Sequence, residues 1–111
     1  MIVVSLGDHN DQLLEAQLDG WSGYIGLSWN EWGQLWTLSV RDLDKDILVS
    51  GIAAVPLWPL LRQVRSPDLP PGEFIIGADP ALTLGRRSFT DGSAVLTYFD
   101  VEDLAEIAAG G

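Results

Sequence analysis

Alternation of apolar and polar residues, with a period of two, runs through most of this chain and is clearest between residues 21 and 41. Side chains of a β-strand point alternately to the two faces of a sheet, so this pattern predicts half-buried strands. One face of the first run is expected to point into the core: Trp21, Gly23, Ile25, Leu27 and Trp29. After a turn at 30–33, the return strand is expected to place inward Trp36, Leu38 and Val40.

Other short stretches share this strand character, namely residues 1–6, 12–18, 47–52, 73–76 and 93–99. Asp-Gly pairs at 19–20 and 91–92 are typical of tight turns, and a polar turn is expected at 42–46. Strands of this length with dense turns favour an all-β fold. We predict a small antiparallel barrel or sandwich of about six to seven short strands.

Two segments break the strand pattern. The first is rich in proline, which lacks an amide donor and cannot lie in a central strand: Pro56, Pro59, Pro67, Pro70 and Pro71. A Pro-rich loop is therefore expected, with room for one short helical turn within 57–64. The second is the C-terminus, where Asp100 can cap a helix. We expect a β domain over 1–100, followed by a short acidic helix or a frayed tail over 101–111.

Composition excludes several classes of function. The chain has 111 residues, enough for one domain, and no cysteine, which excludes disulfides and thiolate chemistry. Sixteen acidic residues against six basic ones give a net charge of −10. Such a charge disfavours a direct grip on nucleic acid or on anionic membranes. The sequence also has no apolar run long enough to span a membrane and no signal-peptide pattern at its N-terminus.

Catalytic and metal-binding patterns are weak. His9 is the only histidine, a poor basis for a metal site or a catalytic base. Asp42, Asp44 and Asp46 resemble the start of a calcium loop, but Ile47 and Ala53 stand where that loop needs Gly and Glu. A hairpin turn is the better interpretation. We therefore expect no enzyme activity, no metal and no cofactor.

Tryptophan and arginine give the best indication of a binding surface. Trp32 lies in a predicted turn and Trp58 between prolines, so both are expected to be exposed. Arg62 and Arg65 follow Trp58 in an otherwise acidic chain, and Trp and Arg are enriched at interface hot spots. The two arginines would contact either an acidic partner or, within the chain, Asp68 and Glu73.

Several sequence pieces, in their order and spacing, resemble the baseplate plug proteins of contractile-tailed cyanophages over roughly residues 1–100. The pieces are Leu27-Ser28-Trp29-Asn30, Trp36-Thr37-Leu38, Leu48-Val49-Ser50-Gly51-Ile52, Pro56 with Leu60-Leu61, and Pro70-Pro71-Gly72-Glu73-Phe74-Ile75. The extension at 100–111 departs from that pattern. The resemblance implies a structural virion protein of the tail baseplate, assembled in the host cytoplasm and without catalysis.

The same resemblance implies partners: the hub, the spike, and tail-tube or tube-initiator subunits, with several copies around the tail axis. Within this chain we expect the partner-facing residues to be Trp58, Arg62, Arg65, Leu69 and Pro71. Two other functions stay open. One is a carbohydrate-binding β module that stacks sugars on Trp32 and Trp58. The other is an acidic adaptor or inhibitor that mimics nucleic acid.

Overall fold

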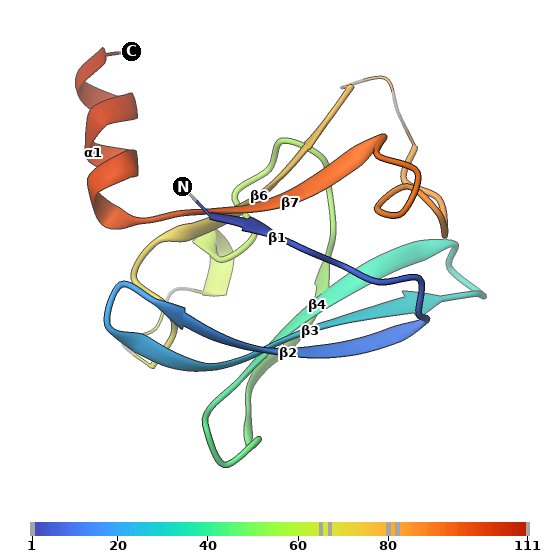
Figure 1. The fold of residues 1–111 in the computed structure, drawn as a ribbon, viewed down its shortest axis with the longest axis horizontal. Coiled ribbons are helices and arrows are strands. Elements are labelled where there is room, and N and C mark those ends of the chain that lie inside the picture. Colours follow the sequence, from blue (N-terminus) through green and yellow to red (C-terminus); the bar gives the residue numbers. More distant parts are fainter. Residues whose placement is uncertain (1, 65, 67, 80, 82, 111) are drawn as a thin grey trace.

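The chain folds as a β-sandwich, seen in a computed structural model that describes residues 2–64, 66, 68–79, 81 and 83–110 (Figure 1). One sheet has the order β2 (Asp11–Leu18), β3 (Trp21–Asn30), β4 (Leu35–Arg41) and β5 (Ile47–Ala53). The other has the order β1 (Ile2–Val4), β7 (Ala94–Phe99) and β6 (Glu73–Ala78). Both sheets are antiparallel. The all-β prediction is confirmed, as a sandwich in which the described strands form no closed barrel.

The four-stranded sheet is a meander built by the turn residues. Asp19 and Gly20 both have positive φ, 56° and 78°, as a two-residue hairpin loop requires. Asn30 Oδ1 accepts a hydrogen bond from the Gly33 amide at 3.0 Å in the next turn. In the third turn, Asp42 Oδ1 accepts hydrogen bonds from the amides of Asp44 and Asp46. Short polar side chains therefore replace backbone pairing where each strand ends.

The core lies between the two sheets. Trp36, Leu38 and Val40 are at most 2 % exposed, so the predicted inward face of β4 is confirmed. The opposite sheet contributes Phe74 and Tyr98, whose rings meet edge to face at 5.1 Å. The remaining buried apolar residues include Leu18, Ile25, Leu27, Leu60, Leu61, Leu69, Ile76 and Leu96.

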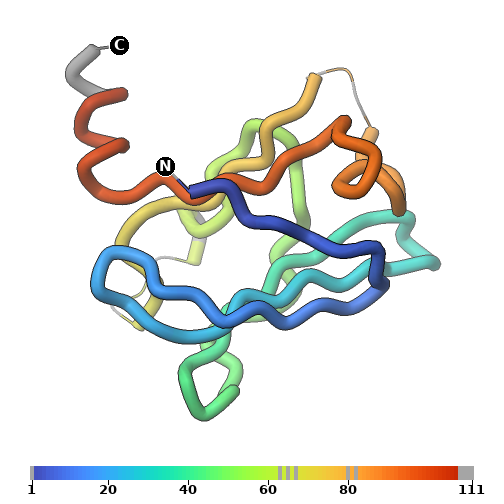
Figure 2. Tube along the Cα trace, viewed as in Figure 1, coloured from blue at the N-terminus to red at the C-terminus, as the bar shows by residue number. Residues whose placement is uncertain are grey.

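The described residues form two short helical elements. A 3-10 helix, η1 (Arg62–Val64), provides the helical turn expected within the Pro-rich loop. The C-terminal α1 (Val101–Gly110) is a helix rather than a frayed tail, and it begins beside the end of β7 (Figure 2). Asp100 Oδ1 accepts the Asp103 amide at 2.7 Å, as the predicted cap requires. Within the described residues, no helix has the length and hydropathy to cross a membrane.

Candidate functional site

The segment 54–61 is held against the edge of β6, and this position defines the candidate site. Pro56 forms a parallel bridge with Ile76, and the Leu57 amide donates to the Ile76 carbonyl at 2.9 Å. The Leu60 amide donates to the Phe74 carbonyl at 3.0 Å. Proline cannot donate to a sheet, so the segment lies beside β6 through the amides of the residues between its prolines.

A buried carboxylate fixes the end of this segment. Glu73 is 4 % exposed, and its Oε1 accepts the amides of Leu61 at 2.5 Å and Phe74 at 3.0 Å. Hydrogen bonds to an ionised group are stronger than neutral ones, and a buried carboxylate needs such partners. Leu60 and Leu61 are thereby held in the core, at 3 % and 0 % exposure.

With its leucines buried, the segment turns other apolar side chains outward. Val55, Leu57 and Trp58 are each about half exposed, at 47 %, 51 % and 47 %. Arg62 follows at the start of η1, is exposed, and forms no salt bridge with a described carboxylate. We call these four residues the Trp58 surface. An exposed apolar cluster with an arginine at its rim has the composition of a protein-binding surface.

Beside Trp58 the surface is hollowed. A depression of about 370 Å³ lies between β5 and the Pro-rich segment, and its lining includes Ile52, Val55, Trp58 and Val64. Gly51, also in the lining, has φ 72° and lies where the pairing of β4 with β5 slips by a residue. A bulge at this position bends the edge strand and opens space beside the tryptophan.

Leu57 has an unusual backbone conformation. Its φ is 62°, in the left-handed region that costs a residue with a Cβ about 1–2 kcal/mol. The hydrogen bond from its amide to the Ile76 carbonyl holds it against β6. A leucine kept both strained and half exposed is unfavourable for folding alone, and such outliers concentrate at functional sites.

The structure places the five predicted partner-facing residues differently. Trp58 and Arg62 lie on the same exposed segment, and Pro71 is exposed on the following loop. Leu69 is 4 % exposed and packs in the core, so its side chain does not face solvent. Arg65 lies outside the described residues. Burial of Leu69 has no signal in the sequence, because a loop leucine between prolines belongs to no periodic pattern.

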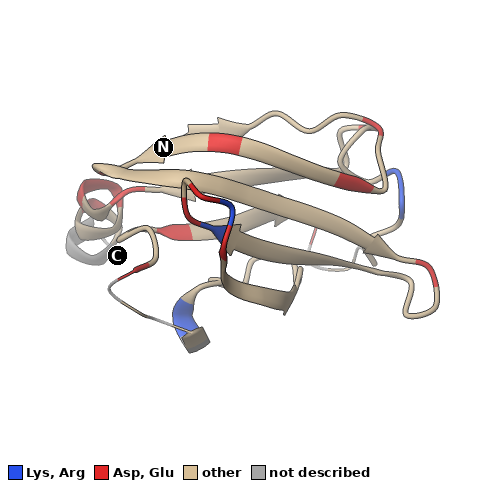
Figure 3. Ribbon diagram, turned by 90° about the horizontal axis from the view of Figure 1, so that it is seen from below, with Lys and Arg blue, Asp and Glu red and all other residues tan. Residues whose placement is uncertain are grey.

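Other sequence candidates lie elsewhere. Trp32 is fully exposed at the β3–β4 turn. The carboxylates of Asp42, Asp44 and Asp46 lie within 4.8 Å of one another. They belong to the turn in which Asp42 Oδ1 accepts hydrogen bonds from the other two backbone amides. Acidic residues are spread over several turns and strands, and basic residues occur at few places along the ribbon (Figure 3).

A polar network that sequence reasoning missed ties the Pro-rich loop to the helix. The buried Tyr98 hydroxyl accepts the Gly72 amide at 2.7 Å and donates to Asp19 Oδ2 at 3.1 Å. The same Asp19 oxygen accepts the amide of Val101, the first residue of α1. Burial raises the pKa of the Tyr98 hydroxyl, the Gly72 amide opposes this shift, and the Asp19 carboxylate adds to it. These residues are 79 and 26 positions apart from Tyr98, so no local pattern joins them.

The sequence profile of the family described as cyanophage baseplate Pam3 plug gp18 matches residues 1–102. The chain belongs to the cyanophage baseplate plug family. No curated protein matches the chain.

Membership in the plug family makes the chain a structural baseplate component of the virion tail, in a family that is not a known enzyme class. The match covers every strand, the Pro-rich segment and the Trp58 surface. Nearly all of α1 lies beyond residue 102, outside the matched range.

Proposed function

We propose that this plug protein sits on the tail axis between the tail tube and the hub or spike, and holds the tube closed until ejection. Its action is mechanical: surface contacts keep it in place, and their loss during contraction frees the channel. The Trp58 surface is the contact that anchors it to a neighbouring subunit. Assembly takes place in the host cytoplasm, with several copies around the axis.

The observation that carries this proposal is the rigid presentation of exposed apolar residues. Backbone bonds to β6 and the carboxylate of Glu73 fix the segment before any partner arrives. A preorganised surface loses little conformational entropy on binding, which favours affinity. The depression beside Trp58 offers a site where a side chain of the partner can be enclosed.

Net charge supports a position in the DNA channel. A chain with charge −10 repels the phosphate backbone, so DNA passing along the channel would not adhere to it. Arg62 is the exception on the Trp58 surface, and it would face an acidic group of the partner rather than DNA.

Co-assembly of variants tests the proposal. Trp58→Ala combined with Arg62→Glu removes the anchor and reverses the charge, and we expect the variant to be depleted from tails assembled in an infected host. Trp32→Ala is the matched control, because it removes a fully exposed tryptophan outside the Trp58 surface. Normal incorporation of the double variant, with the protein folded, would contradict the assignment of this surface.

One observation favours a second function. Trp32 is fully exposed, and a bare tryptophan can stack on a sugar ring. A carbohydrate-binding module would show a change in tryptophan fluorescence on glycan titration that Trp32→Ala or Trp58→Ala removes. Absence of any change across a glycan panel would eliminate this function.

A further inference from the structure

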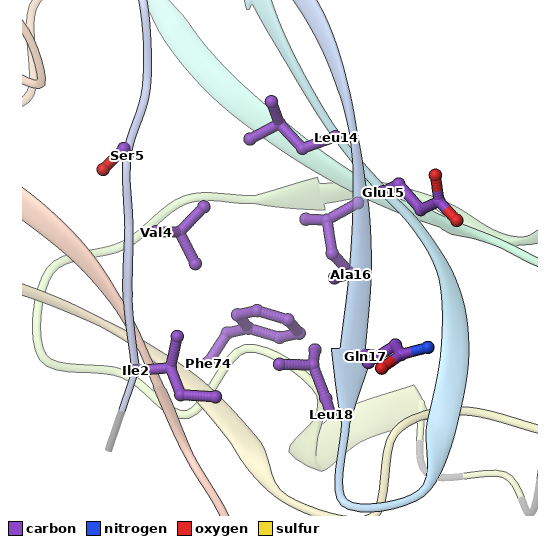
Figure 4. A pocket seen from close by; sticks show the side chains of 10 residues that line it. Ile2, Val4, Ser5, Leu14, Glu15, Ala16, Gln17, Leu18 and Phe74 are labelled. Atoms are coloured by element: carbon purple, nitrogen blue, oxygen red, sulfur yellow. The ribbon is translucent and has the colours of Figure 1, made fainter.

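The two sheets of the sandwich end on one side in strands that have only one partner each. β1 pairs only with β7, and β2 pairs only with β3, among the described strands. Between these two edges lies a cleft of about 290 Å³. Figure 4 shows Val4 on one wall and Ala16 on the other, with the ring of Phe74 between them at the floor.

The opposite side of the sandwich is covered. There the edges β5 and β6 are linked by the chain itself, because the segment 54–61 bonds first to Trp36 and then to Ile76 and Phe74. No described segment plays this role between β1 and β2. The core residues Leu18, Ile25 and Phe74 therefore border an opening on the side of β1 and β2, and not on the side of β5 and β6.

The free edge of β2 carries a row of unused backbone donors. The Trp29 amide donates to the Asn10 carbonyl at 2.7 Å, which fixes the phase of the β2–β3 pairing. Bonds between antiparallel strands alternate, so the even-numbered residues of β2 bond to β3. The amides of the odd-numbered residues point toward the cleft edge: Asp11, Leu13, Glu15 and Gln17.

Side chains along β2 follow the same alternation. Leu14, Ala16 and Leu18 point into the cleft, while Leu13 and Glu15 are exposed on the outer face. The cleft edge thus offers an apolar floor and, beside it, free main-chain groups. This combination is the one used when an extended peptide adds a strand to a sheet.

Charge indicates the kind of strand. The first Lys or Arg of the chain is Arg41, so β1, β2 and β3 carry none, and neither do β6, β7 or α1. Glu15 borders the cleft but turns its side chain to the outer face (Figure 4), and Asp19 follows Leu18 at the end of the cleft away from the 5–10 connection, joined to the start of α1 through Val101. Arg86 is near the other end, paired with Asp8 at 2.9 Å. Among the described residues, the Asp19 end of the cleft therefore has a carboxylate and no Lys or Arg, and it complements a basic segment.

We propose that the cleft between β1 and β2 binds an extended strand of a neighbouring protein, with small apolar side chains at alternate positions and Lys or Arg at its end. The strand pairs with the free amides of β2, and its apolar side chains cover Phe74. The inference rests on the proposed function in one respect, namely that the strand belongs to another baseplate protein. It gives the plug a second contact, separate from the Trp58 surface.

A synthetic peptide that alternates valine and threonine between terminal lysines is the probe. We expect it to bind the full chain, and to slow hydrogen exchange at the amides of Leu13, Glu15 and Gln17 roughly tenfold or more, as one added hydrogen bond does. The same peptide with terminal glutamates should bind at least about tenfold more weakly at low salt.

Two variants test the geometry. Ala16→Phe fills the cleft and should abolish binding, whereas Leu13→Phe places the same ring on the outer face and should bind as the wild type does. Gln17→Pro removes one free amide and leaves the β2–β3 bonds in place, so binding should weaken roughly tenfold. Near-ultraviolet circular dichroism verifies that each variant is folded.

Three results would overturn the proposal: no binding of the lysine peptide, equal binding by Ala16→Phe, or equal affinity for both peptides. A dimer of the chain that Ala16→Phe dissociates would also overturn it, since the occupant would then be a second copy. These outcomes are independent of the proposed function, which fails instead if the chain is absent from assembled tails.

Discussion

Replacing Tyr98 with phenylalanine removes one oxygen from the centre of the molecule and keeps the ring that packs on Phe74. The buried Gly72 amide then loses its hydrogen bond to this oxygen, and the loss of an acceptor by a buried donor costs about 1–3 kcal/mol. Asp19 loses a donor as well, but it is exposed and keeps the Val101 amide, so water compensates most of that loss.

We therefore expect Tyr98→Phe to lower the free energy of unfolding by about 1–3 kcal/mol. A domain of this size has a total stability of about 5–15 kcal/mol, so the loss is large. Urea unfolding followed by tryptophan fluorescence should show a midpoint lower by on the order of 1 M, with an unchanged slope.

Tyr24→Phe is the matched control, because the Tyr24 hydroxyl forms no hydrogen bond with a described residue and its ring is only half buried. The control should change stability by less than about 0.5 kcal/mol. Equal stability of the two variants would refute the reasoning, since it would mean that the Gly72 amide finds another acceptor at no cost.

Further predictions follow from other contacts. Gly72→Ala would place a Cβ in collision with the Phe99 carbonyl and should destabilise the fold by about 2 kcal/mol or more. Gly77→Ala, with 3.8 Å to its nearest atom, should be tolerated, and thermal unfolding of the two variants compares them. Leu57→Gly relieves the strain of the positive φ, so the free energy of unfolding should stay equal or rise by up to about 1 kcal/mol, while incorporation into tails falls. A clear loss of stability would show that the backbone of Leu57 is not strained. Burial raises the pKa of Tyr98, so above about pH 10 the unfolded chain releases the hydroxyl proton before the folded chain does. The free energy of unfolding should then decrease by about 1.4 kcal/mol per pH unit. The decrease should be smaller in Tyr98→Phe, and equal slopes in the two proteins would exclude Tyr98 as its cause. Hydrogen bonds from Ser93 lower the pKa of Asp91, so an NMR titration should show a higher carboxyl midpoint in Ser93→Ala.

Local patterns predicted much of the fold. Alternation identified the inward face of β4, and the Asp-Gly pair at 19–20 gave the hairpin turn, because both signals depend on neighbouring residues. Local patterns could not predict the division into two sheets, because β1 pairs with β7 at the far end of the chain. Length and turn density suit a barrel and a sandwich equally well, and only long-range pairing separates them.

The candidate site was predicted only in part, because some of its contacts join residues that are far apart in the sequence. Exposure of Trp58 follows from its place between prolines, which exclude a central strand. Burial of Leu69 and the role of Glu73 depend on contacts with distant strands, which composition does not encode. The positive φ of Leu57 runs against the preference of leucine and has no signal in the sequence.

Quantitative mass spectrometry of purified virions tests the central claim most directly. We expect this chain to be present in tails at a fixed ratio to the baseplate hub protein and to remain after stringent washing. Its absence from intact particles, or an amount that varies between preparations, would contradict a structural role in the baseplate.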